Sequence, residues 1–389
     1  MNQQSRAEMS PSHETDKQTP SSTAVLSPAT RIVRLPGPLH MYRGGILNGV
    51  EIAYETWGTL NADKSNVVLL FTGLSPNAHA ASSRANPEPG WWEFMLGHDK
   101  PIDTNRFYVI CINSLGSCYG STGPGSINPT TGQAYRLDFP ELSIEDIAFS
   151  AHAALQVLGI DRVHSVVGAS LGGMTALAYA LHYPESFGQL ISLCAGARTN
   201  PFAIAVRSLQ REMIRSDPAW DNGNYPSYRE PVEGMRLARK LGLITYRSAA
   251  EWDGRFARER IGEAHRRAPF DQEFQIESYL EANARKFIGK FDANSYLYLS
   301  RAMDWFDVAE HEERLIALAS SSQGRRALVV GVESDILFPL HQQREMAELL
   351  TRCGMAVNFQ ALASVQGHDA FLVDKVRFAP LMSEFFMAS

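Results

Sequence analysis

The feature that most constrains the fold of this chain is an alternation between short apolar runs and segments with helical periodicity. The alternation extends over residues 66–194 and resumes over residues 326–389. Parallel strands need a crossover of roughly a dozen residues or more, and a helix usually supplies it. The pattern therefore predicts an α/β fold with a mostly parallel sheet. The expected strands are 66–72, 107–112, 163–167, 189–193, 327–332 and 356–362, and the expected helices are 143–158, 171–182, 341–352 and 374–387.

Three regions depart from this alternation. Residues 1–30 hold six Ser, four Thr and three Pro and few large apolar residues, which predicts a disordered tail. Residues 45–57 form a β-like run with a Leu-Asn-Gly turn inside it, which favours an antiparallel hairpin that leads into the sheet. Residues 195–325 are charged and helical in period, without a strong strand, and predict a helical lid insertion. The expected core is thus 31–194 together with 326–389.

Composition and charge exclude several classes of protein. The net charge of −6 lacks the basic excess of nucleic-acid-binding proteins and of polybasic membrane anchors. The apolar runs are too short to cross a bilayer, which takes about 18 residues or more. The four cysteines show neither a CxxC pair nor a zinc-ligand spacing with His, so we expect no disulfide framework and no metal. A cytoplasmic protein that binds small molecules fits this composition best.

A glycine-rich segment between an expected strand and an expected helix carries the first chemical signal. It reads Gly-Ala-Ser-Leu-Gly over residues 168–172 and is the one G-x-S-x-G match in the sequence. In that context the serine lies on a sharp turn at the carboxyl edge of the sheet, and the glycines leave room for the neighbouring chain. Ser170 is therefore the predicted nucleophile. The alternative is a glycine-rich turn with an incidental serine.

A serine nucleophile needs a histidine base, and that histidine needs a carboxylate to fix its tautomer. Asp335 follows the strand 327–332, and His368 follows the strand 356–362. The resulting order Ser, Asp, His is that of the α/β-hydrolase fold, so we predict Ser170, Asp335 and His368 as the catalytic triad. Glu333 and Asp292 are the alternatives for the acid; Glu333 still lies within strand geometry, and Asp292 lies in the helical insertion.

The oxyanion formed at Ser170 needs two hydrogen-bond donors. We expect them to be the backbone amides of Leu171, directly after the nucleophile, and Leu74, after the strand that ends at Thr72. His79, in the same loop, is expected to line the pocket or to be solvated rather than to act in catalysis.

Longer motifs resemble a known family, the homoserine O-acyltransferases on the α/β-hydrolase fold, and within it the branch of the serine O-succinyltransferases. The similarity spans about residues 35–386. Its carriers are Pro89-Gly90-Trp91-Trp92, Ile102-Asp103-Thr104-Asn105-Arg106-Phe107, Gly116-Ser117-Cys118-Tyr119-Gly120-Ser121-Thr122-Gly123-Pro124, residues 168–172 and Lys290-Phe291-Asp292-Ala293-Asn294-Ser295-Tyr296. Such strings are far more specific than G-x-S-x-G alone.

The resemblance implies that Ser170 takes an acyl group from an acyl-CoA and passes it to an amino acid hydroxyl. Acyl-CoA is then a substrate, and no cofactor is needed. The resemblance also implies that Arg211 pairs with the amino acid carboxylate, that Asp369 pairs with its ammonium, and that the protein is a homodimer. Without the resemblance, Arg211 reads equally well as a solvated helix residue.

Two departures from the family pattern bear on the choice of substrate. Ala169 and Leu171 replace the Ser and Met typical of homoserine acetyltransferases, and the loop 73–79 resembles that of the serine-acylating branch. Succinyl-CoA carries a terminal carboxylate, so its enzyme should hold an extra cation. Arg207, one helical turn before Arg211, is the predicted residue for acyl-donor specificity. Leu337 stands where homoserine succinyltransferases of this fold place Arg, which favours an acetyl donor if Arg207 faces solvent.

The sequence therefore predicts a serine O-succinyltransferase activity with a ping-pong mechanism, in cysteine biosynthesis. Acylation of homoserine by acetyl-CoA or succinyl-CoA, in methionine biosynthesis, is the alternative within the same class. An esterase or thioesterase with the same triad is the alternative from another class, because the fold and the triad do not decide whether water or an alcohol accepts the acyl group.

Overall fold

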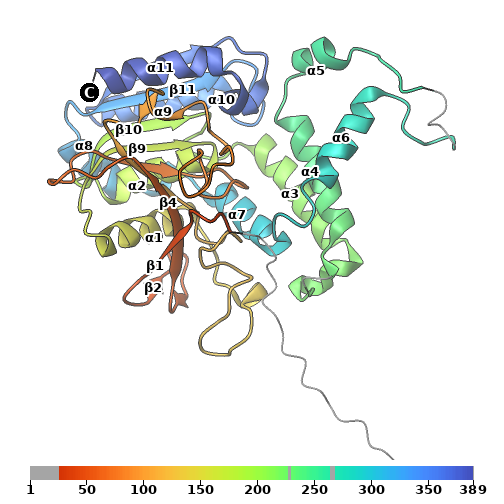
Figure 1. The fold of residues 1–389 in the computed structure, drawn as a ribbon, viewed down its shortest axis with the longest axis horizontal. Coiled ribbons are helices and arrows are strands. Elements are labelled where there is room, and N and C mark those ends of the chain that lie inside the picture. Colours follow the sequence, from red (N-terminus) through yellow and green to blue (C-terminus); the bar gives the residue numbers. More distant parts are fainter. Residues whose placement is uncertain (1–25, 227–228, 263–267, 389) are drawn as a thin grey trace, which may run out of the picture.

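The computed structural model describes residues 26–226, 229–262 and 268–388. An eight-stranded sheet runs through the core, in the order β1-β4-β8-β5-β9-β10-β11-β12 (Figure 1). β4 is antiparallel to both of its neighbours, β1 and β8. The six strands from β8 to β12 in this order are parallel to one another. The strands are β1 (Arg31–Arg34), β4 (Glu51–Trp57), β5 (Val67–Phe71), β8 (Tyr108–Ile112), β9 (Val163–Ala169), β10 (Phe187–Leu193), β11 (Arg326–Val332) and β12 (Ala356–Leu362). The prediction of a mostly parallel α/β sheet is confirmed.

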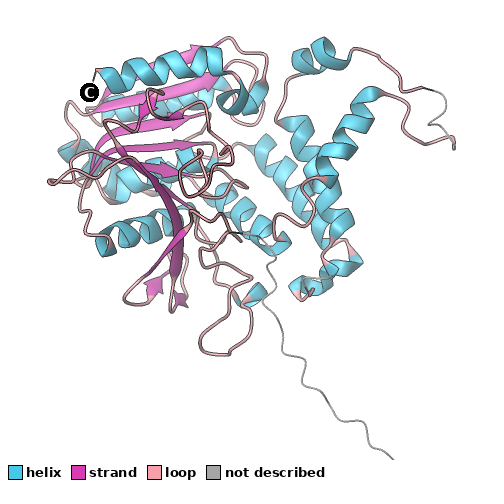
Figure 2. Cartoon of the chain, viewed as in Figure 1, coloured by secondary structure: helices cyan, strands magenta, loops and turns pink. Residues whose placement is uncertain are grey.

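Both faces of the sheet are covered by helices, as a sheet that is apolar on both sides requires (Figure 2). Alternate side chains of β5 point to opposite faces: Leu69 and Phe71 enter one apolar core, and Val68 and Leu70 enter the other. The first core also contains residues of α1 (Ile144–Val157), α2 (Leu171–His182), α8 (Glu312–Ser321) and α9 (Leu340–Arg352). The second contains residues of α11 (Lys375–Met387).

The helices expected from the sequence lie where they were predicted, within one or two residues. Ser143 caps the amino end of α1, and Asp146 completes a capping box there, which fixes the start of that helix. Between β10 and β11 the structure is helical, with only isolated β-bridges in the described residues. The helices are α3 (Pro201–Arg215), α4 (Val232–Thr245), α5 (Ala249–Phe256), α6 (Gln275–Arg285), α7 (Ala293–Trp305) and α8.

These helices do not form one separate body. In Figure 1, α3 to α6 stand to the side of the sheet, at the carboxyl ends of its parallel strands. Leu299 and Met303 of α7 and Leu318 of α8 belong to the apolar core that holds α2, and Ile214 of α3 and Met235 of α4 belong to it as well. The lid function predicted for residues 195–325 stays a prediction.

The hairpin predicted within residues 45–57 is wrong. Its first half is β3 (Ile46–Leu47), which pairs with β2 (Leu39–His40), while β4 pairs with β1 and β8. Since β4 has a neighbour on each side, it leaves no free edge for the residues that precede it. Gly49, with φ at +62°, turns the chain between the two strands without pairing them.

Most of the predicted disordered tail, residues 1–30, lies outside the described residues. Its last residues contact the core: Thr30 Oγ1 donates to Glu55 Oε1 at 3.1 Å, and Asn86 Nδ2 donates to Ser27 Oγ at 2.9 Å. In the described ranges no helix is long and apolar enough to cross a membrane.

Candidate active site

Ser170 lies on a strained turn between β9 and α2. Its φ and ψ are 55° and −123°, a region that residues with a side chain rarely adopt. A Cβ atom on Gly168 would lie 2.0 Å from the carbonyl oxygen of Gly172, and one on Gly172 would lie 2.7 Å from that of Phe71. Only glycine fits at both positions. The turn thus places the serine beside the carboxyl end of β5, where the predicted oxyanion loop begins.

The structure brings the three residues of the predicted triad together. His368 Nε2 lies 2.9 Å from Ser170 Oγ, and His368 Nδ1 lies 2.7 Å from Asp335 Oδ2. The other carboxylate oxygen of Asp335 accepts the backbone amides of Leu337 and Phe338, each at 2.9 Å. Ser170, Asp335 and His368 follow β9, β11 and β12, at the carboxyl edge of the sheet where open α/β sheets bind their ligands.

The surroundings of His368 set its basicity. Burial disfavours the imidazolium, but the charge and hydrogen bond of Asp335, and the charge of Asp369, favour it more, so the pKa of His368 is raised. The ring of Phe338 stacks on the imidazole with centroids 5.2 Å apart, and the ring of Tyr246 lies 6.0 Å away. This packing holds the imidazole in place between the acid and the nucleophile.

Glu333 and Asp292, the two alternative acids, do not contact His368 and have other surroundings. Glu333 is exposed, and its backbone amide pairs with Leu362. Asp292 caps the amino end of α7 by accepting the amide of Ser295, and it accepts the hydroxyl of Tyr225 at 2.6 Å. Of the three candidates, only Asp335 contacts His368.

Polar contacts of His79 and Asn77 hold the carboxyl-terminal end of the predicted oxyanion loop, residues 73–79. His79 Nδ1 lies 2.8 Å from Glu55 Oε2 on β4, and His79 Nε2 lies 2.8 Å from the carbonyl oxygen of Glu88. The indole of Trp91 donates to the carbonyl oxygen of Asn77 at 2.9 Å. His79 is thus buried and paired, and it is neither solvated nor part of the triad.

The roles of Leu171 and Leu74 as oxyanion donors remain a prediction from the sequence. Leu171 is the first residue of α2, so its amide has no acceptor within the helix and is free for a ligand. Leu74 is half-buried in the loop directly after β5, next to the turn that carries the nucleophile.

Arg207 and Arg211 are buried on α3 and share one carboxylate on α7. Arg207 Nε lies 2.6 Å from Asp304 Oδ1, and Arg211 NH2 lies 2.6 Å from Asp304 Oδ2. Arg211 NH1 also donates to Ser300 Oγ at 2.7 Å. Two guanidinium charges on one carboxylate leave one positive charge uncompensated. Neither arginine is a solvated helix residue.

Asp369 follows the catalytic histidine and is also paired. Arg247, just after α4, places Nε 3.2 Å from Asp369 Oδ2, and the amide of Asp369 donates to the carbonyl oxygen of Tyr246 at 3.1 Å. Burial raises the pKa of Asp369, against the opposing charges of Arg247 and His368. Gly367, at φ +66°, lets the segment after α4 pack closely, since a Cβ there would lie 2.8 Å from the Tyr246 carbonyl oxygen.

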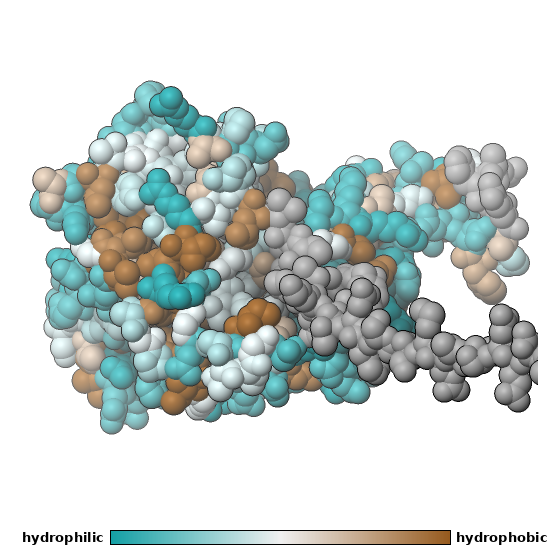
Figure 3. All heavy atoms as spheres, turned by 60° about the horizontal axis from the view of Figure 1, so that its bottom comes forward, coloured by the Kyte–Doolittle hydropathy of each residue, from teal (hydrophilic) through white to brown (hydrophobic). Residues whose placement is uncertain are grey.

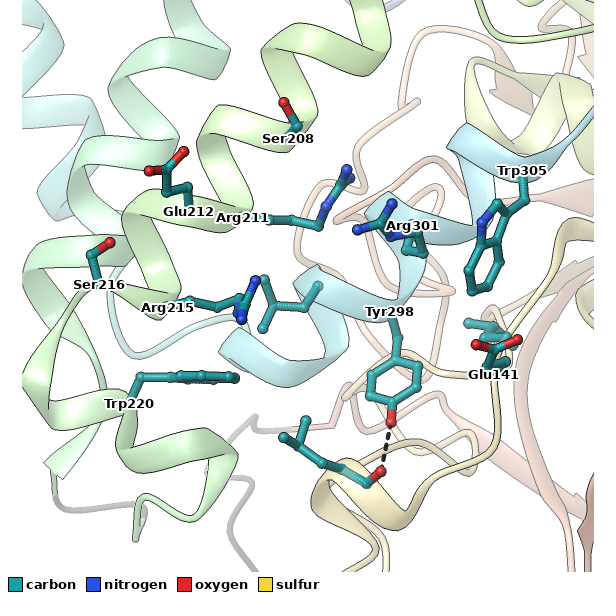
Figure 4. Close-up of a pocket in the computed structure, with 13 residues that line it drawn as sticks. Glu141, Ser208, Arg211, Glu212, Arg215, Ser216, Trp220, Tyr298, Arg301 and Trp305 are labelled. Carbon is teal, nitrogen blue, oxygen red and sulfur yellow. Dashed lines mark hydrogen bonds between the residues drawn. The ribbon is translucent and has the colours of Figure 1, made fainter.

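A large cleft lies on the other side of Arg211, between α3, α7 and the loop before α1 (Figure 4). Its volume is about 880 Å³, and none of the triad residues line it. Arg211 and Arg301 point toward one another across it, and Arg215 lies over the ring of Trp220, at 5.6 Å from the centroid. Arg211 therefore lies in the wall that separates this cleft from Asp304.

Asp304, Arg247 and Tyr246 were not identified from the sequence. Each contacts a predicted site residue that is distant in the chain, as Asp304 does with Arg207 across 97 positions. No local spacing in the sequence predicts such pairs. In the described part of the chain, no group of three or more His, Cys, Asp or Glu side chains is placed to hold a metal ion.

Comparisons with known proteins agree with this geometry. The model of the family described as the alpha/beta hydrolase fold matches residues 66–374. A serine O-succinyltransferase from Litchfieldella anticariensis is 61% identical over 92% of this chain and 98% of its own length. One from Xanthomonas campestris is 54% identical over 93% and 99% of the two chains.

Two solved structures share the whole architecture. A homoserine O-acetyltransferase from Bacillus anthracis superposes with a TM-score of 0.82 at 29% identity, over 92% of this chain and 97% of that one. The esterase E22 superposes with the same TM-score at 28% identity, over 92% and 99%. The fold thus carries both acyl transfer and ester hydrolysis.

Proposed function

The chain belongs to the α/β-hydrolase fold and, within it, to the serine O-succinyltransferase family, and we propose that it transfers a succinyl group from succinyl-CoA to the hydroxyl of L-serine. The observation that carries this proposal is the hydrogen-bonded chain of Ser170, His368 and Asp335, together with a buried pair of arginines and a half-buried aspartate. The first three supply acyl-transfer chemistry, and the others supply partners of both signs for an amino acid.

In the first half-reaction, Ser170 Oγ attacks the thioester carbonyl carbon while its proton passes to His368 Nε2. The developing oxyanion is bound by the amides of Leu171 and Leu74. The carbon–sulfur bond then breaks, the sulfur leaves with the proton that His368 returns, and the acyl group stays on Ser170 as an ester. Asp335 remains ionised and holds the imidazole in the reactive tautomer.

In the second half-reaction, His368 takes the proton of the serine substrate's hydroxyl, whose oxygen attacks the acyl-enzyme carbonyl. The bond to Ser170 Oγ breaks, and the proton returns to Ser170. Arg211 binds the carboxylate of the substrate, and Asp369 binds its ammonium. The uncompensated positive charge of the Arg207, Asp304 and Arg211 cluster supports the first role, and the position of Asp369 directly after His368 supports the second.

An esterase is the alternative of another class, and the similarity to esterase E22 is the observation in its favour. Because an esterase has no use for partners of a zwitterion, the buried Arg211 and the half-buried Asp369 favour transfer. The test is to follow CoA release from succinyl-CoA with and without L-serine and to identify the product. Transfer predicts that O-succinylserine accounts for the CoA released and that release is slow without serine. Equal release in both cases, with free succinate as product, would mean hydrolysis.

The acyl-CoA is a substrate in this reaction, so no cofactor is part of the proposal. We also propose that the enzyme acts in the cytoplasm, in cysteine biosynthesis. Cys111, Cys194 and Cys353 are free and buried, which suits a reducing compartment.

We further propose that the protein is a homodimer joined through its lid helices. Leu209 on α3 and Leu237 and Ile244 on α4 are 42–46% exposed. Leu237 and Ile244 are seven residues apart and so share a helix face. The face drawn in Figure 3 shows apolar areas scattered among hydrophilic residues. Leu237→Glu with Ile244→Glu should convert a dimer to a monomer in light scattering, and an unchanged mass would reject this interface.

A further inference from the structure

A succinyl donor brings a second carboxylate into the active site. This carboxylate needs a cationic partner other than the one that binds the carboxylate of serine. In the second half-reaction the site holds the carboxylate of the succinyl-enzyme together with that of serine. A carboxylate in a buried site needs a cation or several hydrogen-bond donors. This inference therefore rests on the proposed function and deepens it.

Arg207, Arg211 and Arg247 already form ion pairs with carboxylates of the protein. Arg207 and Arg211 share Asp304, so their cluster has one positive charge to offer, and one carboxylate, that of serine, balances it. Arg247 is bound to Asp369 and lies 3.4 Å from Glu251 Oε1. The sequence-based assignment of Arg207 to the succinyl carboxylate leaves serine without a cation of its own.

Arg239, on α4, is different. Of Arg207, Arg211, Arg239 and Arg247, it is the one without an ion pair in the described residues. Its Nε is buried and has no hydrogen-bond partner. Its guanidinium lies against two aromatic rings, 4.6 Å from the centroid of Phe287 and 5.8 Å from that of Tyr246. These rings hold the cation in place but do not neutralise it.

The position of Arg239 connects it to the triad. Tyr246, which caps the carboxyl end of α4, lies seven residues after Arg239 and so on the same side of the helix, and its ring is 6.0 Å from that of His368. Arg239 also opposes the rise that burial causes in the pKa of the Asp369 carboxyl. The Tyr296 hydroxyl, whose pKa burial raises, has Arg239, Arg207 and Arg211 as opposing charges. The charges of all three arginines thus act on Tyr296, and that of Arg207 also acts on His368.

We propose that Arg239 binds the terminal carboxylate of the succinyl group and thereby selects a dicarboxylic acyl donor over acetyl-CoA. Arg207 and Arg211 then serve the amino acid carboxylate. The two carboxylates thus have separate cations, on α4 and α3, and the two half-reactions do not compete for one charge.

The test compares Arg239→Gln with the wild type in kcat/KM for succinyl-CoA and for acetyl-CoA, with L-serine as acceptor. We expect a fall of at least tenfold with succinyl-CoA and a change of less than threefold with acetyl-CoA. Arg239→Lys keeps the charge and should recover part of the loss. Arg236→Gln is the matched control on the same helix, because Arg236 is bound to Glu233 and Glu281, and it should not change the donor ratio.

A second measurement separates this inference from the proposed function. The p-nitrophenyl esters of succinate and acetate acylate Ser170 without CoA or serine, and the burst of p-nitrophenol reports the rate. Arg239→Gln should slow the succinyl burst selectively. If the wild type fails to succinylate serine but the burst is slowed in this way, the function is wrong and the carboxylate site stands.

The outcomes that reject the site are equally distinct. Equal effects of Arg239→Gln on both donors and both esters, or no effect, would overturn it. A donor-selective loss in Arg207→Asn without one in Arg239→Gln would return the role to Arg207. Circular dichroism and thermal unfolding of each variant establish that it is folded before its kinetics are compared.

Discussion

The guanidinium of Arg247 lies 3.2 Å from the carboxylate of Asp369, which joins the segment after α4 to the loop that carries His368. The aspartate proposed to bind the substrate ammonium is thus held by an ion pair from the helical region between β10 and β11. Any movement of α4 would change both the position of this carboxylate and the charge next to His368.

Asp369→Asn should raise the KM for L-serine by roughly ten- to hundredfold, because a hydrogen bond to a charged group contributes about 1.5–3 kcal/mol. The acylation of Ser170 by succinyl-CoA should change much less, since it precedes serine binding. Steady-state kinetics with each substrate varied in turn give both values. A rise confined to the KM for succinyl-CoA would place Asp369 in the donor site instead.

Ser170→Ala should abolish covalent labelling by radiolabelled acyl-CoA. Asp335→Asn should leave labelling detectable but slow, because Asp335 orients His368 and does not react itself. Rapid quenching followed by counting of the protein-bound label measures both. Undiminished labelling of Ser170→Ala would show that another residue is the nucleophile.

Arg211→Ala should raise the KM for L-serine far more than that for succinyl-CoA. The substitution removes a charge-assisted contact of about 1.5–3 kcal/mol and leaves Asp304 with Arg207 alone. Arg215→Ala, on the same helix but outside the proposed binding cluster, is the matched control. If the KM for serine responds equally in both variants, Arg211 has no specific role.

The pH dependence follows from His368. A base must be neutral to accept a proton, and the pKa of His368 is raised above its ordinary value, so kcat/KM for succinyl-CoA should fall as the pH drops below this raised pKa. Asp335 is the main contributor that raises it, so the midpoint of the residual activity of Asp335→Asn should lie at lower pH. Profiles recorded in one buffer mixture test the shift, and a midpoint that moves upward would contradict it.

Gly168→Ala should abolish folding or destabilise the protein by several kcal/mol. The added methyl would lie 2.0 Å from a backbone carbonyl oxygen, which has no flexible side chain to give way. Gly37→Ala meets nothing within 4 Å and should leave the free energy of unfolding nearly unchanged. Denaturant unfolding compares the two, and wild-type stability of Gly168→Ala would refute the packing described for this turn.

The sheet and the order of the triad could be predicted from the sequence because both depend on local patterns. The run from Val163 to Gly172 contains a strand, the glycines of the turn and the start of a helix within ten residues. Asp335 and His368 each follow a strand directly, so the topology of a parallel sheet brings them to one edge. The predicted hairpin failed because strand partners depend on which sheet edges are free.

The charge arrangement around the substrate could not be predicted in the same way. The spacing of Arg207 and Arg211 placed both on one helix face, but it did not reveal that Asp304 binds the two together. Nor did the sequence distinguish Arg239 from Arg236, although only the second is bound by carboxylates. Those ion pairs join helices that are distant in the chain, so they appear only in the folded structure.

The central claim is that this enzyme moves succinyl groups to serine, and a matrix of two donors and two acceptors tests it most directly. The measurement is kcat/KM for succinyl-CoA and acetyl-CoA, each with L-serine and L-homoserine, with the products identified by mass spectrometry. The highest value is expected for succinyl-CoA with L-serine, at least tenfold above each other pair. A highest value for acetyl-CoA with L-homoserine would contradict the claim.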